Sequence, residues 1–457
     1  EFKKEVATVL FKKGYLGPTL RVHSYRIEPM PDEWPPQSHT ALYGKGPIED
    51  ADVKKLFHAF AERAYRRPVA PGEVDTFVEL AQRLVADGNS KQDAMKGAYS
   101  AILCSPDFVY LRQNQGELND FALASRLSYF LWSSMPDEAL MKLARAGKLS
   151  NPAELRRQTE RMLKDPKAAA FGRHFPERWL KLHELGRMEP DKRGPYGHYF
   201  RVKDFLIPQV DAFFSDLLET NGPIRNFIDS DYTFMNKLLG ELIYKQKVVG
   251  EHLQKVKLED TRRGGLLTMP AVMTVTANGV DTSPIVRGVY VLENILGTPP
   301  PSPPPDVEPL SPDLRGVKTL KEQLAVHRNQ EACRSCHQKI DPMGYALESF
   351  DPIGRWRDNY PKVDKKAKQA PPIDTVAALA NGREIKNLVE FKTMLMERES
   401  QVAHCLTEKM LTYATGRLLE AGDRGEIDRV TDELKKDGNR LRDLVHLVVQ
   451  SKIFLNK

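Results

Sequence analysis

A C-x-x-C-H pentapeptide at residues 333–337 constrains this chain more than any other stretch. Two thiols separated by two residues can both form thioethers to the vinyl groups of one porphyrin, and the adjacent imidazole is then placed to be an axial ligand of the iron. The motif therefore predicts one covalently attached haem c, held by Cys333, Cys336 and His337.

Two other uses of the paired thiols stay open from the sequence. A C-x-x-C pair can be a dithiol redox centre, but that chemistry is typical of a βαβ setting, and no such pattern surrounds residue 333. It can also be half of a zinc site, but zinc takes four ligands, usually from two closely spaced pairs. The remaining cysteines, Cys104 and Cys405, stand alone, and we expect them to be unpaired and buried.

Composition indicates a globular protein outside the nucleic-acid-binding and membrane-spanning classes. The 68 basic and 62 acidic residues are interleaved and leave a net charge of only +6, which gives nucleic acid no basic patch to bind. No stretch approaches the roughly twenty consecutive apolar residues of a membrane helix. The chain begins at Glu1 without a signal peptide, yet haem attachment by this motif takes place outside the cytoplasm. We therefore expect a periplasmic or otherwise extracytoplasmic protein whose signal and upstream region are absent from this chain.

Periodicity, turn residues and proline runs predict a mainly α fold. A helical body is followed by a small class-I-like cytochrome c domain, with few short strands, of which residues 273–276 are the most strand-like. Six prolines within residues 299–305 enforce an extended spacer. The expected parts are a linker or the tail of a missing upstream domain (1–50), two helical modules (51–115 and 116–226), a loop-rich module contacting the haem domain (227–298), the polyproline linker (299–309) and the cytochrome c-like haem domain (310–457).

Apolar residues at helical spacing predict the individual helices, and we assign their apolar stripes to core packing rather than to cofactor binding. Asn119 is the expected N-cap of one helix and Asp137 that of the next. Within the haem domain we expect a helix, the motif, a loop region and closing helices. The expected helices lie at residues 52–67, 73–86, 91–103, 119–134, 138–146, 205–218, 286–296, 319–330, 387–398, 401–416 and 439–453, with a further one after Asn151 and Pro152.

Residues that follow the motif can hold the haem and orient its ligand. A proximal imidazole usually donates its second N–H to a carbonyl or carboxylate, and the backbone at Asp341 and Pro342 is close enough in sequence to accept it from His337. Arg355 and Arg357 are candidates to pair with the haem propionates, because guanidinium binds carboxylate bidentately. The alternative for both is a solvated surface arginine.

Two further groups of residues each have two interpretations. Tyr345 and Trp356 either line the haem wall or belong to the ordinary core. The polar residues between 278 and 287 either form a pocket facing the haem or a bound ligand, or cap the helix that starts near Pro284. We favour the cap, because Asp, Ser and Thr are usual before a proline in the first helical turn.

Several strings outside the motif occur together in one known family. They are LSYFLWSSMPD (127–137), RGGLL (263–267), TANGV (276–280), TSP (282–284), RG (287–288), ALE (346–348), FD (350–351), GRWR (354–357) and LTYATGR (411–417). From about residue 52 to the C-terminus the chain resembles the large multi-domain c-type cytochromes abundant in planctomycetes and related bacteria. The resemblance implies an exported protein, often with another cytochrome domain and a carbohydrate-binding-like module upstream, in a family discussed in connection with polysaccharide breakdown. The partners it implies are a redox partner protein or further cytochrome domain, and carbohydrate.

The distal ligand of the iron is left open by the sequence. An electron-transfer haem keeps both axial positions filled, whereas a haem that reacts with a substrate leaves one open or weakly held. His327, in the helix before the motif and similar to a family position, is the distal candidate, with a capping or surface histidine as its alternative. Met410 is a weaker candidate, because the resemblance places apolar residues there and favours core packing. Met343 is too close to the motif to cross the porphyrin. The other residues left open are His252, Met273, Met394, Met396 and His404.

These observations predict an extracytoplasmic monohaem c-type cytochrome acting in redox chemistry, as a haem oxidoreductase or peroxidase-like enzyme linked to polysaccharide breakdown. The alternative is a non-enzymatic electron-transfer or scaffold protein with a six-coordinate haem. A carbohydrate hydrolase with an attached electron-transfer domain is a third class, and it needs an acidic cleft. The sequence contains no nucleotide-binding glycine loop, no H-E-x-x-H zinc motif and no serine-hydrolase elbow.

Overall fold

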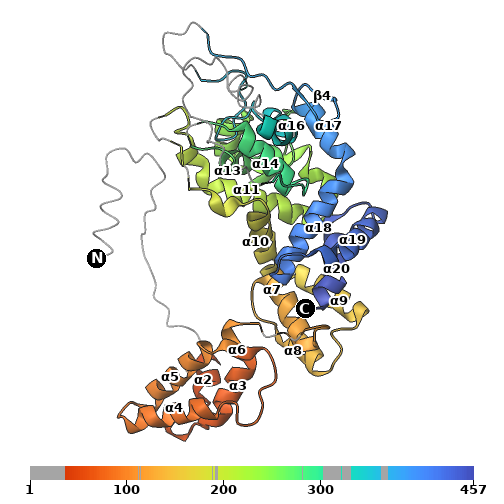
Figure 1. Ribbon diagram of the computed structural model, residues 1–457. Helices are drawn as coiled ribbons and strands as arrows, with labels where there is room; N and C mark the ends of the chain where they lie inside the picture. The colour runs from red at the N-terminus through yellow and green to blue at the C-terminus, as the bar shows by residue number, and fades with distance from the viewer. Residues whose placement is uncertain are drawn as a thin grey trace, which may run out of the picture. The chain divides into compact units, whose positions relative to one another are not determined.

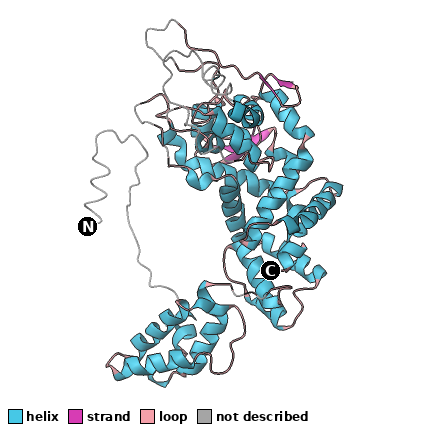
Figure 2. Ribbon diagram, viewed as in Figure 1, coloured by secondary structure: helices cyan, strands magenta, loops and turns pink. Residues whose placement is uncertain are grey.

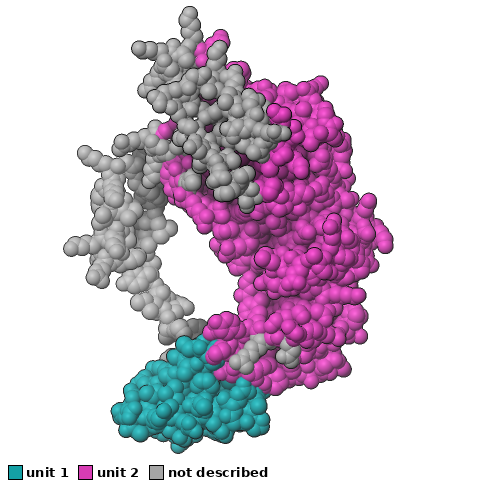
Figure 3. All heavy atoms as spheres, viewed as in Figure 1, with its two compact units in different colours: residues 1–64, 69–105 teal, residues 65–68, 106–457 magenta. Residues whose placement is uncertain are grey.

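Helices make up most of the fold, with two short antiparallel strand pairs (Figures 1 and 2). The computed structural model describes residues 37–111, 113, 115–187, 189–190, 194–279, 281–301, 321, 331–361 and 369–457. This part of the chain divides into two compact units, which we describe separately (Figure 3). The mainly α prediction is confirmed.

The smaller unit, residues 1–64 and 69–105, is a set of short amphipathic helices. It contains α2 (Gln37–Tyr43), α3 (Val53–Tyr65, whose last residue belongs to the other unit), α4 (Asp75–Ala86) and α5 (Lys91–Leu103). Its core includes Phe57, Met95 and Ile102, each with no exposed area. Ser90 caps α5 by accepting a hydrogen bond from the backbone N–H of Asp93, which fixes the start of the helix where the sequence predicts it.

The larger unit, residues 65–68 and 106–457, holds the elements that follow residue 105. Its helices before residue 300 are α6 (Pro106–Val109), α7 (Asp120–Trp132), α8 (Glu138–Arg145), α9 (Pro152–Leu163), α10 (Ala169–Trp179), α11 (Tyr199–Glu219), α12 (Lys237–Leu239), α13 (Pro270–Val275) and α14 (Pro284–Asn294). After residue 330 they are α16 (Glu331–Tyr345), α17 (Leu388–Glu397), α18 (Glu399–Thr415), α19 (Arg424–Lys436), α20 (Leu441–Val449) and α21 (Lys452–Leu455). Strand β1 (Tyr232–Met235) pairs antiparallel with β2 (Gln254–Lys257), and β3 (Ala377–Ala378) with β4 (Glu384–Ile385).

Side-chain caps explain why the helices of the larger unit begin where they do. The side chain of Asn119 accepts from the backbone N–H of Ala122 at 2.9 Å, and that of Asp137 accepts from Leu140 at 3.0 Å. Each satisfies one backbone donor that the first helical turn leaves without a partner. Both predicted N-caps are therefore confirmed.

One hydrophobic core runs through the larger unit, from Leu118 to Phe454. At its centre α10 lies beside α18 and α11 (Figure 1), and aromatic rings interlock there. Phe175 packs 5.6 Å from Phe214 and 5.5 Å from Tyr413, measured between ring centroids. Described residues on both sides of the proline-rich segment share this core, and the predicted division into modules stays a prediction.

The structure corrects several details of the sequence prediction. Residues 273–276 are not a strand, because residues 270–275 form helix α13, which starts with Pro270 at its first position. The helix predicted at 439–453 is divided into α20 and α21, with Ser451 capping the second. Helix α19 and the β1–β2 pair were not predicted. Cys104 is exposed rather than buried, whereas Cys405 is buried, and neither is in a disulfide.

Some predictions fall outside the described residues. These are the N-terminal linker up to residue 36, most of the polyproline linker, and nearly all of the helix at 319–330, which includes His327.

Candidate haem-binding site

The C-x-x-C-H motif lies inside α16, in the N-terminal half of that helix. The structure describes the side chains of Cys336 and His337, which are adjacent along this helix. Cys336 is partly exposed, while His337 is buried, with 8% of its surface exposed. The structure thus places a partly exposed thiol next to a buried imidazole on α16.

The imidazole of His337 is held by a carboxylate one turn further along α16. Its Nδ1 lies 2.8 Å from Oδ1 of Asp341, which is 1% exposed. A carboxylate acceptor favours the tautomer with the proton on Nδ1, so the lone pair resides on Nε2. The sequence predicted that the backbone near Asp341 accepts this bond. The structure places the Asp341 side chain there instead, because the helix continues past the motif to Tyr345.

Two glycines let α14 and α16 cross at backbone contact. A Cβ atom added to Gly344 would lie 1.8 Å from the carbonyl oxygen of Pro284, and one added to Gly288 would lie 2.1 Å from that of Ile340. Real Cβ atoms do not approach carbonyl oxygens so closely, so both positions require glycine. These contacts flank Asp341 on either side and fix the part of α16 that carries it.

A fully buried ion pair reinforces this crossing. Arg287 on α14 and Glu348 just after α16 have no exposed area, and their charged groups are 3.2 Å apart. Nη1 of Arg287 also donates to the carbonyls of Leu347 and Phe350, each at 2.8 Å. Glu348 accepts from the hydroxyl of Thr282 at 2.6 Å. Removing one partner of such a buried pair strongly destabilises a protein, because the other charge is left buried without compensation.

The two candidate propionate-binding arginines contact protein groups in the structure. Arg355 donates from Nε to the carboxylate of Asp351 at 2.6 Å and from Nη2 to the Pro195 carbonyl at 3.1 Å. Arg357 donates to the hydroxyl of Thr282 at 2.7 Å and extends the buried network around Glu348. They are therefore not simply solvated surface arginines, and propionate binding stays a prediction for both.

The neighbouring aromatic residues pack within the fold. Tyr345 is 2% exposed. Trp356 packs edge-on against Phe350 at 5.4 Å, and the guanidinium of Arg262 lies 4.1 Å from the centre of the Trp356 ring system. Both residues have core contacts, and a role in the haem wall stays a prediction.

The polar residues before α14 have two structural roles. Ser283 caps the helix, with its hydroxyl accepting from the N–H of Val286 at 3.3 Å and Pro284 in the first turn. The capping interpretation is confirmed at this residue. Thr282 and Asp281 instead join the network of Arg357 and Glu348, which sequence reasoning missed, because it depends on a loop more than sixty residues away.

The distal candidates are spread over different environments. Met410, Met273 and Met394 are core residues, each with at most 1% of its surface exposed. His404 pairs with Asp428 at 3.2 Å on the surface of α18. His252 is exposed. Core packing accounts for the methionines, and the distal ligand stays open.

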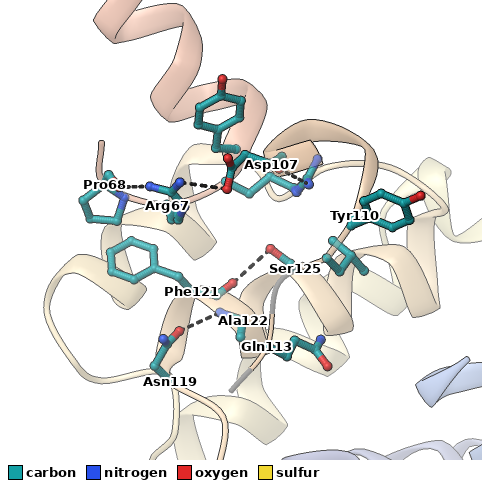
Figure 4. Close-up of a pocket in the computed structure, with 12 residues that line it drawn as sticks. Arg67, Pro68, Asp107, Tyr110, Gln113, Asn119, Phe121, Ala122 and Ser125 are labelled. Carbon is teal, nitrogen blue, oxygen red and sulfur yellow. Dashed lines mark hydrogen bonds and ion pairs between the residues drawn. The ribbon is translucent and has the colours of Figure 1, made fainter. Parts of the chain in front are cut away.

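A separate pocket lies in another part of the larger unit (Figure 4). Arg67 forms an ion pair with Asp107 at 3.0 Å, and Arg66 donates to the carbonyls of Asp107 and Phe108. Ser125 donates to the Phe121 carbonyl at 3.0 Å. The arginines tie the segment around residues 65–68 to α6, and Arg66 also donates to the hydroxyl of Tyr129 on α7. No residue of the haem motif lines this pocket.

Four family models match successive parts of the chain. Each is described as a protein of unknown function: DUF1595 at residues 52–112, DUF1592 at 118–244, DUF1588 at 263–360 and DUF1585 at 381–454. The third covers both α14 and α16, including the motif. The chain belongs to the planctomycete-type multi-domain cytochrome c family. No curated protein and no solved structure matches it.

Membership in this cytochrome family implies haem c, and the residues present fit that group. A partly exposed thiol at Cys336 lies next to a buried imidazole at His337 whose ring is already oriented by Asp341. Among the described residues, no helix is long and apolar enough to cross a membrane. The described parts also contain no group of three or more His, Cys, Asp or Glu arranged to hold a metal ion.

Proposed function

We propose that this planctomycete-type cytochrome is an extracytoplasmic monohaem protein that acts in redox chemistry as a haem-dependent oxidoreductase. The observation that carries the proposal is the buried His337, with its Nδ1 bonded to Asp341, directly after the partly exposed Cys336 on α16. Cys333 and Cys336 would hold the porphyrin, and Nε2 of His337 would bind the iron. Residues 310–457 would form the class-I-like cytochrome domain.

Bound haem supplies one-electron chemistry at the iron. What the chain contributes is positioning: α14 holds α16 at two glycines, and α16 holds His337 through Asp341. Arg355, Arg357 and the Pro342 segment would be next to the cofactor, and a redox partner protein or further cytochrome domain would exchange electrons with it. Carbohydrate is a further proposed partner, in line with a role in polysaccharide breakdown.

The test begins with covalent attachment. The chain is exported to the periplasm of a host that matures c-type cytochromes and is then denatured, after which protein-bound haem is measured in wild type, Cys336→Ala and Cys104→Ala. We expect haem in wild type and in Cys104→Ala, because Cys104 is an unpaired thiol outside the motif. We expect its loss in Cys336→Ala. Wild-type protein without covalent haem would contradict the proposal.

Spectra then separate the two functions that remain. Optical and electron paramagnetic spectra are recorded for oxidised and reduced protein, with and without cyanide, peroxide and carbon monoxide. A high-spin haem that binds these ligands supports an oxidoreductase. A low-spin haem indifferent to all three supports the alternative, an electron-transfer or scaffold protein with a six-coordinate haem.

A further inference from the structure

The carboxylate of Asp341 is the feature of this site with consequences beyond haem attachment. We propose that Asp341 is a positioning residue that makes His337 an unusually strong donor to iron and thereby gives the haem a low reduction potential. The inference rests on the proposed function and deepens it, because it specifies the redox regime in which the same site works.

The geometry of the pair is that of a charge-assisted hydrogen bond. The His337 and Asp341 side chains are 10% and 1% exposed, and Nδ1 and Oδ1 are 2.8 Å apart. Hydrogen bonds to a charged acceptor are shorter and stronger than those to a neutral carbonyl, and a water-poor environment strengthens them further. A carboxylate on Nδ1 raises the basicity of the ligating imidazole. A more basic ligand favours ferric over ferrous iron, which lowers the reduction potential.

The surrounding fold holds the carboxylate in place. Ile340 and Gly344, on either side of Asp341, are in backbone contact with Gly288 and Pro284 of α14. Pro342 follows directly and has no N–H of its own to donate. Rotation or displacement of this turn would drive backbone atoms of the two helices into each other. The Asp341 carboxylate is therefore preorganised toward the imidazole before any cofactor binds.

The competing explanation is purely structural. Side chains four residues apart on a helix often pair, and such pairs stabilise a helix modestly. A pair with only that role would affect thermal stability but neither the proton position on His337 nor the potential of the haem. The two explanations therefore differ in measurable quantities other than activity.

The first measurement needs no cofactor. The haem-free full chain is labelled with ¹⁵N-histidine, and the His337 signals are identified by their loss in His337→Gln. We expect wild type to show the Nδ1–H tautomer and Asp341→Asn to show a mixture, because an amide can present either its oxygen or its NH₂ group to the ring. Asp358→Asn is the control, since that exposed carboxylate bonds Trp356. An unchanged His337 tautomer in Asp341→Asn would overturn the positioning role.

The second measurement is the reduction potential of the haem-loaded protein. We expect Asp341→Asn to shift the equilibrium between oxidised and reduced haem at least tenfold toward the reduced form, which is about 59 mV for a one-electron couple. Asp341→Glu should shift it less, and Asp358→Asn not at all. An Asp341→Asn protein with a lower Tm but the wild-type potential would overturn the inference. If the chain binds no haem, the proposed function and the low potential both fail, while the tautomer measurement still decides the positioning role.

Discussion

At the level of single residues, the buried charges of this cytochrome are compensated unequally. Arg287 and Glu348 are fully buried but paired with each other, and Arg287 also donates to the Leu347 carbonyl. Lys392 is almost fully buried and bonds Asp229 at 2.8 Å, yet its burial lowers the pKa of the ammonium group. Asp211 on α11 is different, because its Oδ1 is buried without a hydrogen-bond partner among the described residues. An acid in that situation favours its neutral form.

This environment makes the stability of the protein depend on the protonation of Asp211. Burial raises its pKa to about 7, although Arg173 works in the opposite direction. In the unfolded chain the pKa is about 3.9, so the folded state binds the proton more tightly, and stability falls as pH rises from about 4 to about 7. We expect Asp211→Asn to raise Tm relative to wild type at pH 8 and to leave it unchanged at pH 4. Melting curves at both pH values decide this.

A matched control for that experiment is Asp432→Asn on α19. Asp432 is exposed, and substitutions at such positions change stability by less than about 0.5 kcal/mol. Asp432→Asn removes the same charge as Asp211→Asn, but from a carboxylate that is exposed to solvent. Equal effects of the two substitutions at pH 8 would show that net charge, not the burial of Asp211, controls the stability.

At the level of elements, the decisive contact is the crossing of α14 and α16. Their glycines allow an approach that no side chain would permit, and the Arg287–Glu348 pair lies next to it. Helices in ordinary contact are 8–10 Å apart because side chains separate them. Here the backbone of α16 contacts the backbone of α14 directly. This contact explains how a partly exposed haem motif can be held rigidly in place.

The same substitution should therefore have opposite effects in two helices. Gly344→Ala in α16 places a methyl group 1.8 Å from the Pro284 carbonyl oxygen, and overpacking of this kind costs about 1–3 kcal/mol or more. Gly425→Ala in α19 meets no atom within 4 Å, so it should stabilise the protein by about 0.5–1 kcal/mol through helix propensity. Denaturant unfolding of both variants measures this. Equal effects would show that α14 and α16 are not in backbone contact.

The elements also show where sequence reasoning succeeds. Helices with polar caps and clear apolar stripes, such as α5 and α7, were predicted well because the signals are local. Helix α19 was missed because it is dominated by charged residues and has only four buried positions, three of them apolar. The β-branched side chains among residues 273–276 favour a strand, but packing among helices overrides that propensity.

The candidate site was predictable only in part, for a related reason. The motif residues follow directly from their spacing. The bond from His337 to the Asp341 side chain requires α16 to stay helical as far as Asp341, directly before Pro342, where a helical conformation is normally disfavoured. The network of Arg287, Glu348 and Thr282 joins segments distant in sequence, and no local pattern specifies such contacts.

At the level of the whole molecule, the two units have separate cores. The core of the larger unit runs without interruption from Leu118 to Phe454 and ties both of its ends together. Arg126 on α7 donates to the carbonyl of Asn456 at 2.8 Å, and the backbones of Gly116 and Lys457 exchange hydrogen bonds. The smaller unit buries its own apolar residues among α3, α4 and α5. Multi-domain chains that are divided in this way do not unfold in a single two-state transition.

We therefore expect two thermal transitions, each of which responds to its own core. Ile102 and Ile224 both have no exposed area, one in the smaller and one in the larger unit. Ile→Val at a buried position costs about 0.5–1.5 kcal/mol. In a unit of 60–100 residues, each kcal/mol of lost stability lowers Tm by roughly 4–8 °C, and the shift is smaller in a larger unit. Calorimetry should show Ile102→Val moving one transition and Ile224→Val moving the other. If both substitutions moved a single common transition, the two cores would unfold together. The stability of the smaller unit would then depend on the larger unit rather than on its own packing.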